Sequence, residues 1–262
     1  MLRIRSEQMQ TFEQATMAAF EARMVDHLRT YFPWHYRIWG PETTRQIVHY
    51  GCKKAQEYGF TTERNICLYL TLMATLGGNF DNDLQLPWVT QILSDASLRE
   101  PTVRIDRLTD QAMEFLDLTV GQKDHYLNRA LLRVRNELPE LLADLSFPDV
   151  TTHALAMLRK LFPQKYRVVG EACLQGLVKD GVRRAGNYGI TTRYGQLIVI
   201  GLMFMFGSGF ATDPQLPDFA IILQDPTLAA QQKAEKLHQL ALEYVEKWVT
   251  WTTAESDNGK AQ

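Results

Sequence analysis

Residues 77–98 read GGNFDNDLQLPWVTQILSDASL, and residues 207–228 repeat this pattern as GSGFATDPQLPDFAIILQDPTL. A shift of 130 positions aligns residues 32–98 with residues 162–228 without a gap, and 24 of the 67 aligned pairs are identical. A gap-free register of this length is typical of a tandem duplication. We therefore predict two homologous domains, at residues 1–120 and 121–253, followed by a polar, disordered tail at residues 254–262.

The composition is that of a globular protein, with 262 residues, 45% hydrophobic content, 22% charged content and a net charge of −2. This charge gives no reason to expect nucleic acid or an anionic membrane as a partner. The most apolar run, residues 197–206, has half of the roughly 20 residues that a membrane span needs, so we expect no span. The N-terminus has no apolar core of signal-peptide length, and Cys52, Cys67 and Cys173 lie at non-equivalent places in the two copies. Both features favour a cytoplasmic protein with free thiols.

An all-α fold is expected because no stretch has the alternation of a strand. The first helix is predicted at residues 6–31. In each copy a short connection, residues 34–40 in the first, leads to a helix that ends at Tyr-Gly, at 42–58 and 171–188. The most apolar helix follows, at 65–76 and 196–206, and a charged amphipathic helix closes each copy, at 103–118 and 229–251. Residues 121–145 are predicted to form a further helix between the copies.

The repeated loop that follows the apolar helix contains residues to which we assign structural roles. The aromatic side chains of Phe80 and Phe210 are expected to anchor the loop. Proline is favoured at the first position of a helix, so Pro87 and Pro217 are expected to start the short helix that follows.

Asp83 and Asp213 occur at the same place in the two loops. We expect each carboxylate to accept hydrogen bonds from amides of its own loop or of the next helix start, a local structural role. A partly buried ion pair with Arg37 or Arg167, which are also repeated, is a variant of this role. A catalytic carboxylate is the remaining alternative, although no repeated acid, histidine or nucleophile lies near either aspartate in the sequence.

No motif in the sequence indicates catalysis, a metal or a cofactor. Asp81 and Asp83 resemble the start of a calcium-binding loop, but Leu86 and Ile92 occupy the positions that require glycine and glutamate. None of the six histidines is repeated or part of a metal motif, and no phosphate-binding or nucleophile motif is present. The helix pairs also differ from DNA-reading helix-turn-helix units, because their second helices are too apolar to expose base-reading side chains. We therefore expect neither an enzyme nor a nucleic-acid-binding protein.

Three tryptophans distinguish the first copy from the second. Trp34, Trp39 and Trp88 have Gln, Val and Asp as their counterparts. Tryptophan is over-represented at binding hot spots, so the three are candidate partner-binding residues. The alternative is that they fill the seam between the domains or pack on the first helix.

The motif YGFTTER at residues 58–64, followed by residues 77–88, resembles a family of uncharacterised bacterial proteins associated with type VI secretion and polymorphic-toxin loci. The N-terminal MLRIRSEQM also resembles the start of these proteins, and the second copy departs from the motif at Asp218. The resemblance implies a cytoplasmic accessory protein that binds a protein partner: a chaperone, co-chaperone or adaptor of a secreted effector. An immunity protein that neutralises a toxin is the alternative.

Overall fold

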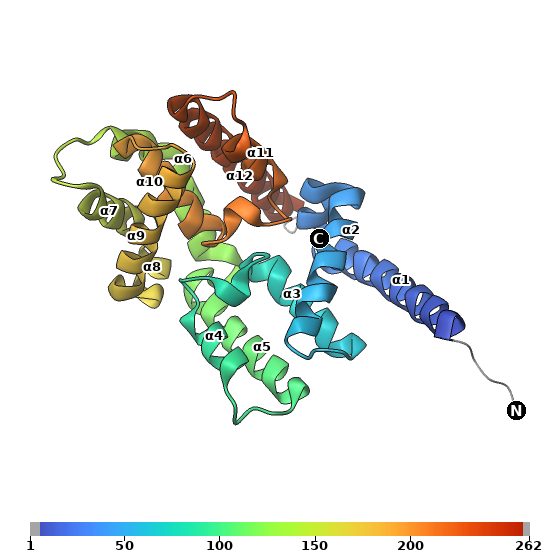
Figure 1. The fold of residues 1–262 in the computed structure, drawn as a ribbon. Coiled ribbons are helices and arrows are strands. Elements are labelled where there is room, and N and C mark those ends of the chain that lie inside the picture. Colours follow the sequence, from blue (N-terminus) through green and yellow to red (C-terminus); the bar gives the residue numbers. More distant parts are fainter. Residues whose placement is uncertain (1–5, 259–262) are drawn as a thin grey trace, which may run out of the picture.

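The computed structural model describes the backbone of residues 6–258 and the side chains of residues 15–250. Within this part of the chain all regular structure is helical and no strand is present (Figure 1). None of the helices described there combines the length and the apolar character that crossing a membrane requires. The prediction of an all-α fold is therefore confirmed.

From residue 6 onward, the first half of the chain contains five α-helices and one 3-10 helix: α1 (Ser6–Tyr31), α2 (Pro33–Glu57), α3 (Glu63–Leu76), η1 (Phe80–Asn82), α4 (Pro87–Ser94) and α5 (Pro101–Thr119). The 3-10 helix η2 (Gln122–Asp124) and helix α6 (His125–Ala143) follow. The second half continues with α7 (Val150–Leu161), α8 (Pro163–Val169), α9 (Glu171–Asn187), α10 (Arg193–Phe206), η3 (Phe210–Thr212), α11 (Pro217–Gln224) and α12 (Ala230–Asn258).

Helix boundaries recur in the register that aligns residues 32–98 with residues 162–228. Helices α3, η1 and α4 begin and end at the positions equivalent to those where α10, η3 and α11 begin and end. The local causes also recur: the hydroxyls of Thr62 and Thr192 accept the amide hydrogen bond that caps α3 and α10. Gly77 and Gly207, with φ of 103° and 99°, end these two helices in a conformation that side chains disfavour. The same capping residue and the same terminal glycine thus set the same helix boundaries in both halves.

The packing partners of these helices recur as well. Helix α3 packs against α2 and α5, and α10 packs against α9 and α12. Each half has its own hydrophobic core, in which the apolar helix is central. Helix α6 packs against α7, α10 and α12, and its buried side chains therefore join the second core. Helices α5 and α8 also contact each other and link the two halves.

The predicted connection at residues 34–40 is wrong, because the chain there is helical. Pro33 is the first residue of α2, and its fixed φ suits the first turn of a helix. Gly40, with φ of 73°, then kinks α2. In the second half the same break, at Gly170, separates α8 from α9. Proline and glycine here delimit a short helix rather than a loop.

The C-terminal helix is longer than the sequence predicts. We expected α12 to end near residue 251 and residues 254–262 to form a disordered tail, whereas the helix continues to Asn258. The tail prediction is therefore wrong for residues 254–258, and residues 259–262 lie outside the described part of the chain.

Candidate functional site

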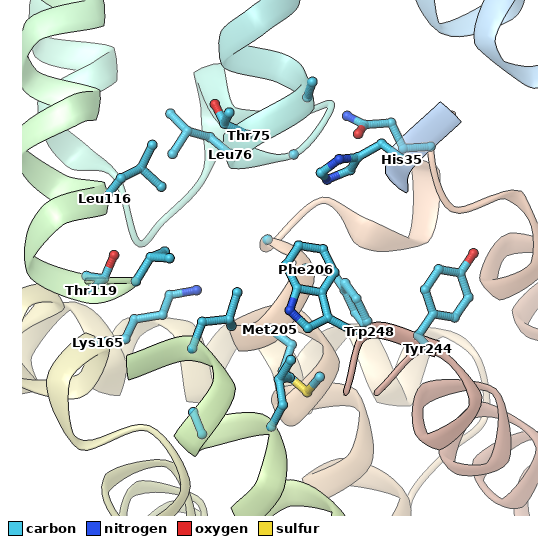
Figure 2. Close-up of a pocket in the computed structure, with 18 of the residues that line it drawn as sticks. His35, Thr75, Leu76, Leu116, Thr119, Lys165, Met205, Phe206, Tyr244 and Trp248 are labelled. Carbon is cyan, nitrogen blue, oxygen red and sulfur yellow. The ribbon is translucent and has the colours of Figure 1, made fainter. Parts of the chain in front are cut away.

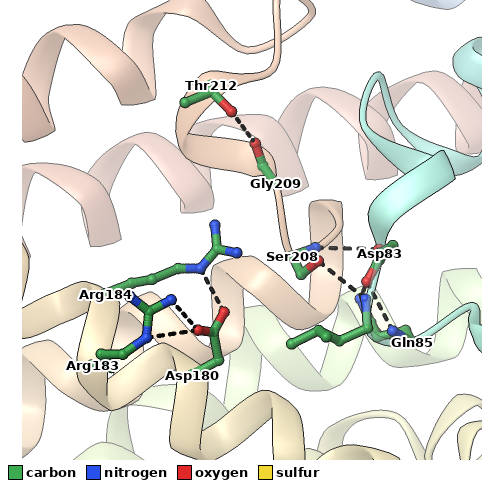
Figure 3. Close-up of polar contacts among 9 residues, drawn as sticks. Asp83, Gln85, Asp180, Arg183, Arg184, Ser208, Gly209 and Thr212 are labelled. Atoms are coloured by element: carbon green, nitrogen blue, oxygen red, sulfur yellow. Dashed lines mark hydrogen bonds and ion pairs between the residues drawn. The ribbon is translucent and has the colours of Figure 1, made fainter.

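The loops that follow α3 and α10 meet at the seam between the two halves. Asp83 accepts a hydrogen bond from the amide of Gln85 at 2.9 Å and, across the seam, one from the amide of Ser208 at 3.2 Å (Figure 3). Asp213 makes the same pair of bonds, to the amide of Gln215 at 2.8 Å and to the amide of Gly78 at 2.7 Å. Each aspartate therefore closes a turn in its own loop and holds the opposite loop.

The two glutamines extend this reciprocal arrangement. The side-chain amide of Gln85 donates to the carbonyl of Met203 at 2.9 Å, and that of Gln215 donates to the carbonyl of Met73 at 2.8 Å. Both carbonyls lie in the last turn of an apolar helix, and that of Met73 also accepts a hydrogen bond from the amide of Gly77. We call these six bonds of Asp83, Gln85, Asp213 and Gln215 the crossed-loop network.

The crossed-loop network changes the role assigned to the aspartates. We expected local bonds, with an ion pair to Arg37 or Arg167 as a variant, and the bonds to Gln85 and Gln215 are local. The bonds to Ser208 and Gly78 are not, since they join segments that are distant in the sequence. A Cβ at position 78 would lie 2.3 Å from Oδ1 of Asp213, so a side chain there would require Asp213 to shift. The other loop residues lie as assigned: Phe80 and Phe210 are buried, and Pro87 and Pro217 begin α4 and α11.

Burial of Asp213 has an electrostatic consequence. Removal from water disfavours the ionised carboxylate and raises the pKa of Asp213 to about 6, although the amides of Gln215 and Gly78 act in the opposite direction. The carboxylate of Asp213 therefore takes up its proton at a higher pH than an exposed aspartate does, while it lies inside the seam.

Asp81, the first residue of the pattern that resembles a calcium-binding loop, interacts with side chains of the same chain. Its carboxylate accepts a hydrogen bond from the hydroxyl of Tyr58 at 2.7 Å and lies 3.5 Å from the ammonium of Lys54. In the second half, the basic residues Arg183 and Arg184 of α9 pair instead with Asp180, an acidic residue of the same helix (Figure 3). Among the described residues no group of three or more His, Cys, Asp or Glu side chains is placed to hold a metal.

A cavity of about 280 Å³ lies along the seam beside the crossed-loop network. Its walls come from the starts of α2 and α8, the ends of α3 and α10, and from α5, α6 and α12 (Figure 2). Many lining residues occupy positions that the alignment of residues 32–98 with residues 162–228 makes equivalent. Four of these pairs are identical (Gly77 and Gly207, Asp83 and Asp213, Gln85 and Gln215, Leu86 and Leu216), and four differ (Trp34 and Gln164, His35 and Lys165, Thr75 and Met205, Leu76 and Phe206).

One side of the cavity is aromatic. The rings of Trp34 and Trp248 meet edge to face, with centroids 5.8 Å apart. His35 lies between Trp39, at 5.2 Å, and Trp248, at 6.0 Å. Burial lowers the pKa of His35 to about 4, so the imidazole is neutral at physiological pH. This side of the cavity therefore presents large apolar surfaces and no positive charge.

The other side of the cavity is cationic. Lys165 of α8 extends into the cavity, opposite His35, Trp248 and Tyr244 in Figure 2. Its ammonium donates to the carbonyl of Phe204 and lies 4.6 Å from the centroid of the Phe204 ring. Burial lowers the pKa of Lys165 to about 8, and the negative charge of Asp83 offsets part of that effect. The side chain is still mostly protonated at neutral pH.

The structure separates the three tryptophans that the sequence singled out. Trp34 and Trp39 line the cavity, and Trp39 is only 9% exposed. Trp88 packs against Phe115 at 6.3 Å, at the edge of the first core, and is half-buried. The three do not form one exposed patch, and their binding of a partner stays a prediction.

No sequence pattern singled out Lys165, His35 or Trp248 as part of a site. The first two occupy equivalent positions, two residues after Phe162-Pro163 and Phe32-Pro33. That placement, at the start of a short helix that the sequence did not predict, was the available signal. Trp248 lies in α12, and it is not the counterpart of Trp34, Trp39 or Trp88.

Comparisons of this chain with models of known protein families, with curated proteins and with solved structures find no match.

Proposed function

We propose that this protein is a non-enzymatic, protein-binding accessory factor: a chaperone, co-chaperone or adaptor for a type VI secretion effector. The observation that supports binding is the cavity at the seam, where Trp34, Met205, Phe206 and Trp248 are only half-buried. Pockets with predominantly apolar walls and a few convergent polar groups are typical binding sites. The assignment to type VI secretion rests on the resemblance of residues 58–64 and 77–88.

In this proposal a client protein inserts an apolar side chain into the cavity. Trp34 and Trp248 are the anchors, because buried aromatic side chains dominate the energetics of interfaces. The client is held by a pocket that is largely formed before it binds, which limits the entropy lost on association. A factor of this kind acts in the cytoplasm, before the effector is exported.

We also infer that the two halves derive from one duplicated helical unit. The gap-free register of residues 32–98 with residues 162–228 supports this inference, as do the helix boundaries that recur at equivalent positions. The paired positions around the cavity support it further. The domain limits that follow are residues 1–120 and 121–253.

The test is co-purification of the partner from the host with tagged wild-type and variant protein. Trp34→Ala and Trp248→Ala are expected to reduce recovery of the partner by about tenfold or more, because truncation of a central anchor costs about 2 kcal/mol. Trp88→Ala is the matched control, since Trp88 lies outside the cavity lining. Circular dichroism establishes that each variant is folded.

Two results would overturn this assignment. If folded Trp34→Ala and Trp248→Ala retain the partner, the cavity is not its binding site. If the partner is a toxin whose activity the complex blocks, the protein is an immunity protein rather than a chaperone.

A further inference from the structure

We infer that the cavity at the seam binds an apolar ligand that carries one carboxylate, with Lys165 as the residue that holds the carboxylate. The inference concerns the cavity itself and does not depend on the identity of a client protein. It rests on three properties of the site: the hydrogen-bonding capacity of Lys165, the apolar surface opposite it and the volume between them.

The ammonium of Lys165 has hydrogen-bonding capacity to spare. A lysine ammonium has three N–H donors. Among the residues that the structure describes, the carbonyl of Phe204 is the one acceptor within hydrogen-bond distance of this group. Two donors thus remain in a cavity whose walls are mostly apolar, where a charged group without partners is costly. A carboxylate supplies two acceptor oxygens and the opposite charge.

The acidic side chains near Lys165 are bound by other groups, so an anion can still pair with its ammonium. Asp83 lies close enough to influence Lys165, but its oxygens already accept bonds from the amides of Gln85 and Ser208. Asp213 is likewise bound by amides of Gln215 and Gly78. Among the described residues, Lys165 forms a hydrogen bond with the carbonyl of Phe204 and no ion pair with either carboxylate. The carboxylates of Asp83 and Asp213 are therefore bound within the crossed-loop network and are not paired with Lys165.

The opposite wall suits an apolar body. Trp34, Trp248, Tyr244 and Phe206 provide aromatic surface, and His35 is neutral there. A cavity of about 150 Å³ accommodates benzene, so 280 Å³ suits about eleven non-hydrogen atoms. A carboxylic acid of this size spans from Lys165 toward the aromatic wall.

Two matched pairs of probes test the inference by calorimetry on the purified protein. Octanoate is compared with 1-octanol, which has the same chain without the charge. N-acetylleucine is compared with N-acetylleucinamide, which differs in the carboxylate alone and represents the end of a protein chain. Each carboxylate is expected to bind about tenfold or more tightly than its neutral counterpart, the difference that a hydrogen bond to a charged group makes.

The variant Lys165→Met removes the charge and retains an apolar side chain of similar length. It is expected to bind octanoate no more tightly than 1-octanol, while its affinity for 1-octanol is unchanged. Lys179→Met, at an exposed lysine of α9, is the control and should bind as wild type does. The unchanged affinity for 1-octanol distinguishes a lost anion contact from a collapsed cavity.

The outcomes are distinct. Binding of octanoate alone identifies a free acid as the ligand, and binding of N-acetylleucine as well identifies the C-terminus of a protein. The inference is overturned if neither carboxylate binds more tightly than its neutral counterpart, or if Lys165→Met leaves that preference intact. Because no client protein is present in this assay, its failure is separate from failure of the co-purification test.

Discussion

Asp213 is buried and bridges two amides that lie on opposite sides of the seam. Replacement by alanine removes the acceptor for the amides of Gly78 and Gln215, both of which are buried. A buried donor left without a partner costs about 1–3 kcal/mol, so Asp213→Ala is expected to lower the free energy of unfolding by about 2–4 kcal/mol. Urea denaturation measures this loss.

Asp225 provides the matched control for that variant. It accepts a local bond of the same kind from the amide of Thr227, and one from the Thr227 hydroxyl, but it lies at the surface and takes no part in the crossed-loop network. Asp225→Ala should therefore change the stability far less than Asp213→Ala. Equal effects of the two substitutions would show that only the local turn matters.

The raised pKa of Asp213 also makes stability depend on pH. The folded-state pKa of about 6 exceeds the ordinary value of 3.8, so the folded protein binds this proton more tightly than the unfolded chain. The resulting stabilisation is fully present below the unfolded pKa and is lost as the pH rises through about 6.

We expect the stability of the wild type relative to Asp213→Asn to fall by about 1–3 kcal/mol between pH 4 and pH 7. Asparagine does not titrate, so the other acids of the protein contribute equally to both proteins. The measurement is chemical denaturation at several pH values. A difference that stays constant across this range would contradict a raised pKa.

Between elements, two glycines at equivalent positions lie where one helix packs closely against the next. Gly51 of α2 faces α3, where a Cβ would lie 2.3 Å from Cδ2 of Leu70 and 2.7 Å from the sulfur of Met73. Gly181 of α9 faces Ile200 of α10 in the same way, at 2.7 Å. Helices this close have no space for a methyl group.

Gly51→Ala is therefore expected to destabilise the protein by about 1–3 kcal/mol, the usual cost of overpacking a core. Gly176→Ala is the control, because nothing lies within 4 Å of a Cβ at this exposed position of α9. Alanine there should be neutral or stabilise by about 0.5–1 kcal/mol, since it favours the helix. Thermal unfolding of the two variants measures these changes in stability. A Gly51→Ala variant that is as stable as the wild type would show that α2 and α3 can move apart.

The elements were predictable where their signals are local. Thr62 caps α3 and Gly77 ends it, and both residues are recognisable in the sequence alone. The short helix after Phe32 was missed because Pro33 and Gly40 indicate a break as readily as a helix of two turns. The local half of the role of Asp83 was predictable for the same reason, since its bond to Gln85 spans two residues.

The remaining part of the site depends on how the halves meet. No local signal pairs Asp83 with Ser208 or brings Trp34 to Trp248, because these contacts join distant segments. The repetition of Gln85 as Gln215 indicated a shared constraint but not its partner. The volume of the cavity depends on how far apart the two hydrophobic cores pack, and a sequence pattern does not encode that distance directly.

At the scale of the whole molecule, the crossed-loop network couples the two halves. Asp83 and Asp213 act on the same seam, so loss of one loosens the contact that the other needs. Asp83→Ala and Asp213→Ala are expected to be non-additive, with the double variant less destabilised than the sum by about 0.5–3 kcal/mol. A double-mutant cycle in urea measures this coupling.

The combination of Asp83→Ala with Asp225→Ala is the reference for that cycle. Asp225 takes no part in the crossed-loop network, so these two substitutions should add. Strict additivity of Asp83→Ala and Asp213→Ala would mean that the two halves meet without depending on each other.

The four unlike pairs around the cavity give it a direction. Two identical chains related by a dyad would place the same side chain at both members of each pair, and a molecule on the dyad could then bind either way round. A single chain is free of that restriction. Here His35 is paired with Lys165 and Trp34 with Gln164, at positions that a homodimer would be obliged to keep equal. The two ends of the cavity therefore differ, and whatever enters it has one preferred orientation.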